Sequence, residues 1–183
     1  MDRVKIIGFS AKARHGKDSS CLILKRKLEE QGNKVLIVAN ANYVKYLVAT
    51  YFGGTYQRTP ENRTLWQKFG TELVRNRQPD FWVDTLIDFA KVFGEDYDYF
   101  LLSDCRFRNE YTRWMIKGFD VTSVRVKRLG FENDLTPEQR LHASETSLDN
   151  YNFDYYIKAE NGLDKLEIEI DKFIEWMKES VDY

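Results

Sequence analysis

One stretch decides the fold of this chain: Gly8-Phe9-Ser10-Ala11-Lys12-Ala13-Arg14-His15-Gly16-Lys17-Asp18-Ser19-Ser20. It follows the apolar run Val4-Lys5-Ile6-Ile7 and leads into a helix-like segment over residues 21–30. This order of strand, small-residue turn, Gly-Lys, hydroxyl groups and helix suits phosphate, because the turn points backbone N–H groups inward and a helix N-terminus lies behind them. Lys17 would reach the terminal phosphates as a mobile positive charge. The stretch therefore predicts a site for a nucleoside triphosphate.

The turn agrees with the pattern G-x-x-x-x-G-K-[ST] at Gly16 and Lys17 and departs from it at two positions. Ala11 stands where the pattern has its first Gly, and Ala is tolerated unless the turn needs a positive φ there. Asp18 stands where the pattern has the hydroxyl that ligates Mg²⁺. Because a carboxylate is also a hard oxygen ligand, we expect Asp18 to bind the ion directly or through water, with Ser19 as a further candidate. The alternative is an ordinary β-to-α turn whose lysine is solvated.

The amino-acid composition limits the classes of protein to which this chain can belong. A length of 183 residues predicts one domain with a sizeable core. With 28 basic and 29 acidic residues the net charge is -1, so no overall basic field favours a polynucleotide substrate. Cys21 and Cys105 stand far apart, without CxxC or His clustering, which argues against a zinc site and a disulfide scaffold and fits a reducing, cytoplasmic compartment. No apolar run has the length of a membrane span, so we expect no membrane association.

Apolar runs alternate with helix-like segments along the chain. We expect strands over residues 4–9, 35–38, 97–102, 121–126 and 155–157. We expect helices over residues 17–31, 43–52, 108–117 and 163–177, and others that start near residues 59, 80 and 136. The helix near residue 59 would carry Leu65, Trp66, Phe69 and Leu73 on one face. This alternation predicts an α/β fold with a parallel sheet, helices on both faces and ligands at the carboxyl ends of the strands.

A second polar group follows the predicted strand Tyr99-Phe100-Leu101-Leu102. Asp104 comes at the end of this strand, where enzymes with a phosphate-binding turn place an acidic partner for Mg²⁺. The alternative role for Asp104 is a helix cap. Arg106 is suited to clamp a phosphate bidentately. Asn109 and Glu110 fit the cap and the dipole partner of the next helix.

Other candidates are weaker when taken one at a time. Lys45 and Arg75 lie between the second and third expected strands, and such residues are more often solvated charges than ligands. Trp82 fits either the core or a platform for base stacking. Arg128 ends a predicted strand and opens the polar loop 129–134, which we interpret as a mobile lid, the alternative being a solvent loop. A cation there would neutralise charge on a transferring phosphoryl group, an effect worth about 10³–10⁵ in rate.

Taken in order, these blocks resemble the deoxynucleoside monophosphate kinases of the phage type, a branch of the P-loop nucleoside monophosphate kinases that also looks related to animal phosphomevalonate kinase. The resemblance extends over residues 7–170. Its blocks are Ala13-Arg14-His15-Gly16-Lys17-Asp18-Ser19, Ala41-Asn42-Tyr43-Val44-Lys45, Gln67-Lys68-Phe69-Gly70-Thr71-Glu72 with Arg75, Pro79-Asp80-Phe81-Trp82-Val83, Ser103-Asp104-Cys105-Arg106-Phe107-Arg108-Asn109-Glu110, His142-Ala143-Ser144-Glu145 and Phe153-Asp154-Tyr155-Tyr156-Ile157. The chain departs from the family at Asn42-Tyr43, where the family has Asp-Pro.

The resemblance implies a three-layer P-loop kinase fold in one domain over residues 1–183, with a helical acceptor-binding insert at about 40–93 and a lid at about 128–147. It implies that the ATP phosphates bind to Ala13, Arg14, His15, Gly16, Lys17, Asp18 and Ser19. It makes Lys45, Arg75, Trp82, Arg106 and Glu145 substrate-binding candidates. The catalytic candidates are Lys17, Arg106 and Arg128, and the metal candidates are Asp18, Ser19 and Asp104.

We therefore expect transfer of the γ-phosphoryl group of ATP to a (deoxy)nucleoside 5′-monophosphate, with Mg²⁺ as cofactor. One alternative is a kinase for another phosphorylated metabolite, such as phosphomevalonate. A second is a nucleotide-binding regulatory module without transfer activity. The sequence leaves open the preferred base, the choice between deoxy and ribo acceptors, and the assembly state, with a homodimer among the options.

Overall fold

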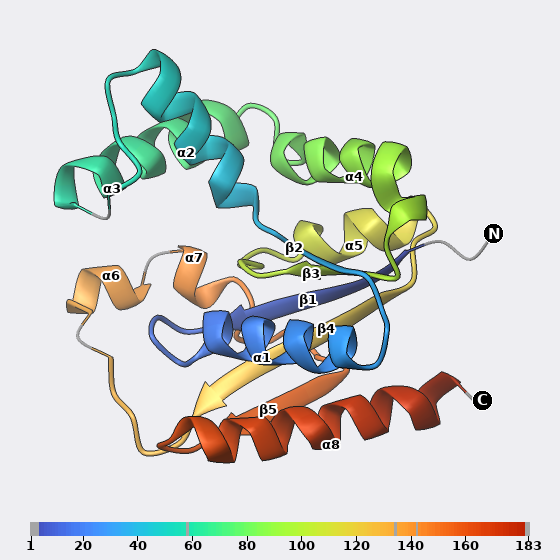
Figure 1. Ribbon diagram of the computed structural model, residues 1–183. Helices are drawn as coiled ribbons and strands as arrows, with labels where there is room; N and C mark the ends of the chain where they lie inside the picture. Colours follow the sequence, from blue (N-terminus) through green and yellow to red (C-terminus); the bar gives the residue numbers. More distant parts are fainter. Residues whose placement is uncertain (1–3, 58, 134, 142, 182–183) are drawn as a thin grey trace.

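The computed structural model describes residues 4–57, 59–133, 135–141 and 143–181, without the side chains of residues 138, 139 and 181. Five strands form one sheet in the order β2-β3-β1-β4-β5, and every neighbouring pair is parallel (Figure 1). The strands are β1 (Lys5–Ala11), β2 (Val35–Val38), β3 (Tyr99–Leu102), β4 (Val121–Arg128) and β5 (Tyr155–Ala159). The parallel sheet expected from the alternation is confirmed.

Helices cover both faces of the sheet (Figure 1). Two of them, α1 (Lys17–Glu30) and α8 (Leu163–Val181), pack on one face, and α4 (Phe81–Phe93) and α5 (Asn109–Ile116) pack on the other. The central strand β1 serves both layers: Ile7 and Phe9 join the cluster of α1 and α8, whereas Ile6 joins that of α4 and α5. Successive strand residues point to opposite faces, so an apolar run without polar interruption is what a strand buried on both sides requires.

A third, smaller core lies within residues 40–93, the range for which the sequence predicted an insert, and most of it is formed between β2 and α4. This segment contains α2 (Asn40–Tyr51), α3 (Pro60–Gln67) and η1 (Lys68–Arg75). Figure 1 shows α2 and α3 away from α1 and α8, on the side of the sheet that carries α4. Val44 and Val48 of α2 and Trp82 of α4 form the buried centre of this core.

Helix η1 is a π-helix, which the sequence did not predict. The Asn76 N–H donates to the Thr71 carbonyl oxygen at 3.0 Å, an i→i+5 bond. We expected Leu73 to face inward with Phe69, but Leu73 is 42% exposed and Val74 packs against the small core instead. The prediction for Leu73 was wrong because the wider turn of a π-helix moves the next inward position after Phe69 from i+4 to i+5.

The chain leaves β4 at the edge of the sheet where β1 also ends. It then passes through two short helices, α6 (Pro137–Leu141) and α7 (Ala143–Thr146), before it enters β5. Figure 1 shows both helices near the turn that joins β1 to α1. A single 3₁₀ turn, η2 (Gly94–Asp96), precedes β3. None of the helices in the described ranges is long and apolar enough to span a membrane.

Gly8, in the middle of β1, is required by a close approach of α5. A Cβ at this position would stand 2.4 Å from Cε1 of Tyr111 and 3.2 Å from Sγ of Cys105. The Tyr111 side chain is fully buried and its ring packs against those of Tyr151 and Phe153. We therefore expect Gly8→Ala to lower the free energy of unfolding by about 1–3 kcal/mol, measured by urea denaturation.

The control repeats this substitution in a Tyr111→Ala background, where the clashing ring is gone. Gly8→Ala should then cost much less than in the parent. An equal loss of stability in both backgrounds would show that the ring contact is not the reason for the glycine.

Candidate functional site

The turn between β1 and α1 has the backbone shape that binds anions. Arg14 and Gly16 both lie in the left-handed region, with φ of 62° and 92°. The His15 N–H donates to the Lys12 carbonyl oxygen at 3.3 Å, and the Ser20 N–H donates to the Gly16 carbonyl oxygen at 2.9 Å, where α1 begins. Closely spaced left-handed residues curl the chain so that its N–H groups converge on a concavity.

The departure at Ala11 has a simple explanation. Ala11 is the last residue of β1 and pairs with Val126 of β4. An extended strand residue needs no glycine, so Ala is acceptable there. The positive φ that the turn does require falls on Arg14 instead.

Lys17 begins α1 beside this turn. Its side chain is 15% exposed, and its Nζ lies 2.7 Å from Oδ1 of Asp18, whose side chain is 64% exposed. Ser19 follows in the first helical turn and is half-buried. Because a lysine carries a compact charge on a flexible stem, Lys17 is able to turn from Asp18 to a phosphate without a movement of the helix.

Asp104 follows β3, and the N–H of the next residue, Cys105, donates to the Phe9 carbonyl oxygen of β1 at 3.1 Å, so Asp104 lies near the end of β1. Burial raises the pKa of the Cys21 thiol in α1; Lys17 opposes this rise, and Asp18 and Asp104 add to it. The Cys21 thiol therefore lies within electrostatic range of all three charged groups. The strand-end carboxylate and the phosphate-type turn thus lie at one edge of the sheet, as the parallel arrangement predicts.

Asp104 also caps a helix, but not the helix that follows it. Its Oδ1 accepts from the Asn40 N–H at 3.0 Å and its Oδ2 from the Ala41 N–H at 2.8 Å. These are the first amides of α2, which therefore begins before the predicted residue 43. A carboxylate at a helix N-terminus satisfies amides that have no partner within the helix. The alternative role of Asp104 as a cap thus describes a contact that is present, and it fixes the insert to the sheet.

The residues present fit Mg²⁺ held together with a nucleotide better than Mg²⁺ held by protein alone. In the described part of the chain, no group of three or more His, Cys, Asp or Glu side chains is placed to hold a metal. Mg²⁺ is commonly bound through one or two carboxylates plus substrate phosphates and water. Asp18 and Asp104 offer two such carboxylates, and each oxygen of a carboxylate keeps acceptor capacity after one hydrogen bond.

Arg75 is held by the segment after β3 and does not project freely. Its Nη2 lies 2.5 Å from Oε1 of Glu110, its Nη1 donates to Oδ1 of Asn109 at 3.3 Å, and its guanidinium stacks 4.0 Å from the ring centre of Phe107. Oε2 of Glu110 accepts from the Arg106 N–H at 2.6 Å. Burial raises the pKa of Glu110, and Arg75 and the backbone donors oppose that rise. Glu110 therefore lies in the first turn of α5, where a carboxylate favours the helix dipole as expected, and it is also the counter-ion of Arg75.

Glu145 of α7 connects the lid segment to the turn and to Arg106. Its Oε1 lies 2.6 Å from Nη1 of Arg106, and its Oε2 accepts from the Ala13 N–H at 3.1 Å. Lys12 donates to the Glu145 carbonyl oxygen and lies 2.5 Å from Oδ1 of Asp149. Sequence reasoning did not single out Lys12 or Asp149, because only the folded chain brings these segments together.

His15 connects the turn to the start of the lid segment. Its Nδ1 accepts from the Arg128 N–H at 3.0 Å, and its ring meets that of Phe131 edge to face at 5.6 Å. The Arg128 guanidinium stacks 4.5 Å from the centre of the same Phe131 ring and bonds to Oδ1 of Asn161. Burial lowers the pKa of His15; Arg125, Arg128 and Lys12 lower it further, and Glu145 opposes them. The neutral ring, which accepts at Nδ1, is therefore the favoured form.

Two residues expected to contact substrate have structural roles here. Trp82 is 2% exposed, and its Nε1 donates to the Gly70 carbonyl oxygen at 2.8 Å. Its ring thus belongs to the small core with Val44 and Val48, which is the first of the two roles expected for it, and its contact with substrate stays a prediction. Nζ of Lys45 lies 5.4 Å from the ring centre of Trp66, a cation–π contact within the insert.

One cavity lies between the turn and the lid segment. This cavity has a volume of ≈ 320 Å³ and is lined by residues that include Lys12, His15, Phe131, Arg140 and Glu145. This volume lies at the lower end of the range for ligand pockets. The turn and the lid therefore face each other across an open space.

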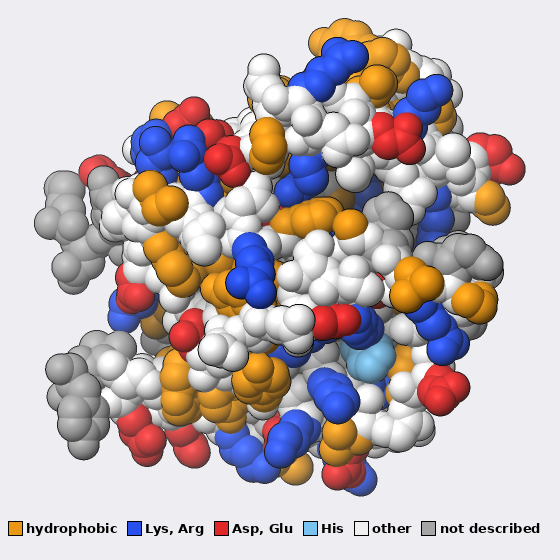
Figure 2. All heavy atoms as spheres, turned by 180° about the vertical axis from the view of Figure 1, so that it is seen from behind, with side chains coloured by type: hydrophobic (Ala, Val, Ile, Leu, Met, Phe, Trp, Pro, Cys, Tyr) orange, Lys and Arg blue, Asp and Glu red, His pale blue; other side chains and the backbone are white. Residues whose placement is uncertain are grey.

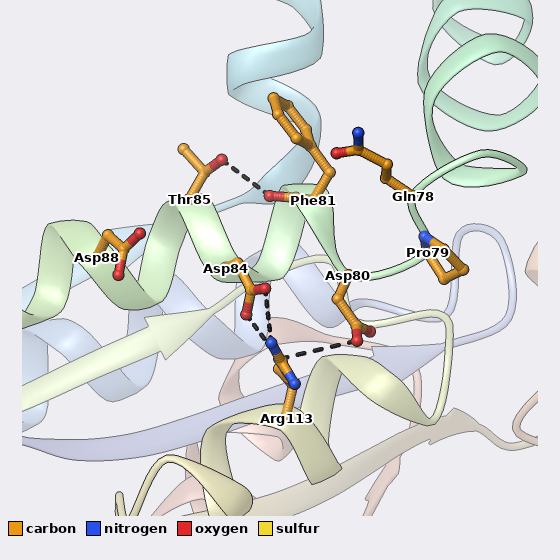
Figure 3. Close-up of a pocket in the computed structure, with 8 residues that line it drawn as sticks. All are labelled: Gln78, Pro79, Asp80, Phe81, Asp84, Thr85, Asp88 and Arg113. Atoms are coloured by element: carbon orange, nitrogen blue, oxygen red, sulfur yellow. Dashed lines mark hydrogen bonds and ion pairs between the residues drawn. The ribbon is translucent and has the colours of Figure 1, made fainter.

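A larger cavity of ≈ 420 Å³ lies elsewhere, between α4 and α5. Figure 3 shows Arg113 of α5 pointing toward Asp84 and Asp80, and its Nε lies 2.7 Å from Oδ1 of Asp84. The acidic side chains there are paired with Arg113 or face solvent, and none of the candidates from the sequence lines this cavity. The space-filling view in Figure 2 shows acidic and basic side chains interspersed over one face of the molecule.

No protein-family model matches the chain, and no curated protein matches it. Solved structures do match. The APS kinase of Mycobacterium tuberculosis in complex with AMPPNP and APS has a TM-score of 0.54 at 14% identity, over 96% of this chain and 99% of that chain. A sugar kinase from Janibacter sp. HTCC2649 has a TM-score of 0.51 at 12% identity, over 96% of this chain and 95% of that chain.

These likenesses cover whole chains at low identity, so they establish the fold. The chain has a three-layer α/β fold with a central parallel sheet, as the sequence predicted, and it shares this fold with the two kinases. The comparisons support this general fold, and they do not test the resemblance to the phage-type branch. His142, from one of the blocks that carry that resemblance, lies outside the described residues.

The left-handed conformation of Arg14 gives a test of the turn. A side chain at positive φ costs about 1–2 kcal/mol, because its Cβ approaches the carbonyl oxygen. We therefore expect Arg14→Gly to be more stable toward urea than Arg14→Ala by about 1 kcal/mol. Both variants lack the guanidinium, so the comparison isolates the backbone. A more stable Ala variant would contradict the conformation described for the turn.

The environment of His15 predicts its titration. Its pKa in the folded chain lies below the ordinary value of 6.5, so its stabilising contribution is complete above pH 6.5 and is lost as the pH falls through the lowered pKa. The chain has two histidines, so an NMR titration is simple to assign with His15→Gln. The His15 signal should have its midpoint below 6.5. A midpoint at or above 6.5 would mean that the bond to the Arg128 N–H does not hold the neutral ring.

Proposed function

We propose that this chain transfers the γ-phosphoryl group of ATP to a (deoxy)nucleoside 5′-monophosphate. The observation that carries the proposal is the convergence of three cationic segments at one edge of the sheet: the turn with Lys17, the strand-end segment with Arg106, and the lid segment with Arg128. Hydrogen bonds join them, from Arg106 to Glu145, from the Ala13 N–H to Glu145, and from the Arg128 N–H to His15. Such a site can hold a donor and an acceptor that both carry phosphate.

The proposed phosphoryl transfer does not require a strong general base. A phosphate monoester has its second pKa near 6, so the acceptor oxygen is already ionised at neutral pH. The barrier is then lowered by alignment of the two phosphates and by neutralisation of their charge. Lys17 begins the helix beside the turn and would stay in contact with the phosphoryl group during its transfer. Arg106, whose side chain is 41% exposed, is accessible from the same edge.

Mg²⁺ bound with ATP would neutralise charge on the bridging phosphates, with Asp18, Ser19 and Asp104 as the residues that would hold it. In this account, the capping contact of Asp104 with α2 also sets the position of the insert relative to the ATP site. Residues 40–93 then form the acceptor-binding insert, with Lys45 and Arg75 as its cations. Residues 128–147 form the lid within a single domain.

A kinase for another phosphorylated metabolite is the second candidate. Two observations favour it: the Trp82 indole is buried in the core of the insert, and Asn42-Tyr43 stands where the nucleotide kinases have Asp-Pro. The third candidate is a nucleotide-binding module without phosphoryl-transfer activity. It would bind ATP, and no acceptor would accelerate ADP release.

An acceptor panel separates these functions. ADP release would be measured with each deoxy and ribo nucleoside monophosphate and with phosphomevalonate, side by side. The proposal predicts that at least one nucleoside monophosphate accelerates ADP release well above the rate with ATP alone. Acceleration by phosphomevalonate only would select the second candidate, and ATP binding without any acceleration would select the third.

Lys17→Met tests the role of the turn. The variant should keep its fold, because Lys17 has no part in the clusters that form the core. Its turnover should fall by about 10²–10³-fold or more, as when one stabilising group for developing charge is removed. Lys91→Met, at an ion-paired site on the surface of α4, is the control and should keep the parent rate. Turnover near that of the parent in Lys17→Met would end this account of the turn.

A further inference from the structure

Glu145 holds two groups of the kind that bind phosphate. Its carboxylate accepts from the Ala13 N–H of the turn at 3.1 Å and pairs with the Arg106 guanidinium at 2.6 Å. Its side chain is 7% exposed, whereas that of Arg106 is 41% exposed. A backbone amide of an anion-binding turn and an arginine are the two donor types that a phosphate oxygen also seeks.

The surroundings keep the carboxylate in this position. Lys12, from the same turn, donates to the backbone carbonyl oxygen of Glu145, and Nη1 of Arg106 lies 3.4 Å from the Ser144 carbonyl oxygen. The lid segment is therefore attached to the turn near its end through α7, and near its beginning through the bond from the Arg128 N–H to His15. The chain between these two contacts lines the cavity at the turn.

We propose that Glu145 is an internal competitor for the anion site: its carboxylate and a polyphosphate oxygen bind the same donors, so polyphosphate binds only as Glu145 leaves them. This inference rests on the proposed function, because it describes how the same site is regulated. Departure of the Glu145 carboxylate removes the side-chain contacts that attach the end of the lid segment to the turn and to Arg106. Binding of the donor and weakening of this attachment are thereby coupled.

The opposite role for Glu145 makes a different prediction. If the carboxylate only positioned Arg106 to receive phosphate, then its removal would weaken binding, because the guanidinium would lose its orientation. If the carboxylate is a competitor, its removal strengthens polyphosphate binding, because the carboxylate no longer has to leave the donors first. The sign of the change in affinity therefore decides between positioning and competition.

Calorimetric titration of inorganic tripolyphosphate and of MgADP measures this sign directly. Glu145→Gln keeps the shape of the side chain and removes its charge, and we expect it to lower both dissociation constants by about tenfold. Asp149→Asn is the matched control: it removes one negative charge beside Lys12 and Arg125 but has no bond to Arg106 or to an amide of the turn. It should lower the dissociation constants much less.

Unchanged or weaker binding by Glu145→Gln would overturn the inference, as would an equal gain in Asp149→Asn, which would point to general charge instead of competition. If Glu145→Gln does not fold, Glu145→Asp serves in its place, since its shorter side chain cannot hold both donors and should also tighten binding. A parent that binds neither ligand would overturn the proposed function together with the inference. A parent that binds both, without a gain in either Glu145 variant, would overturn the inference alone.

Discussion

The left-handed backbone at Arg14 and Gly16 is the constraint on which the rest of the site depends. It turns the chain between the central strand and α1 at the carboxyl end of β1, and closely spaced left-handed residues are the conformation in which N–H groups converge. The sheet then brings further segments to the same edge, because all of its strands are parallel. Asp104 after β3 and Arg128 at the end of β4 reach this edge through their strands alone.

Carboxylates attach three segments of the molecule to one another near this edge. Asp104 fixes the start of α2, Glu110 pairs with Arg75 of η1, and Glu145 joins α7 to the turn and to Arg106. Each of them meets a cation or backbone amides that would be costly to bury unpaired. The segment 40–75 and the helix α7 are thus attached by polar contacts, whereas the core between the sheet and its helices is apolar.

Local patterns were sufficient for much of the fold and insufficient for the partners within the site. Uninterrupted apolar runs predicted the buried strands, and the turn around Gly16 predicted the order of strand, turn and helix that begins the fold. The π-helix was missed because its longer period shifts Val74 into the place expected for Leu73, and no residue type signals that shift. The pairing of Asp104 with α2, the burial of Trp82 and the contact between Glu145 and Ala13 join residues far apart in the sequence, so only the assembled sheet determines them.

The central claim is that the turn between β1 and α1 is where polyphosphate binds, and backbone NMR tests it most directly. The amide signals of the chain would be followed during titration with MgATP. The account predicts that the largest shifts fall on residues 13–20, with smaller ones near Asp104 and Arg106. Shifts centred on the cavity between α4 and α5, around Asp80 and Arg113, with the turn unaffected, would contradict it.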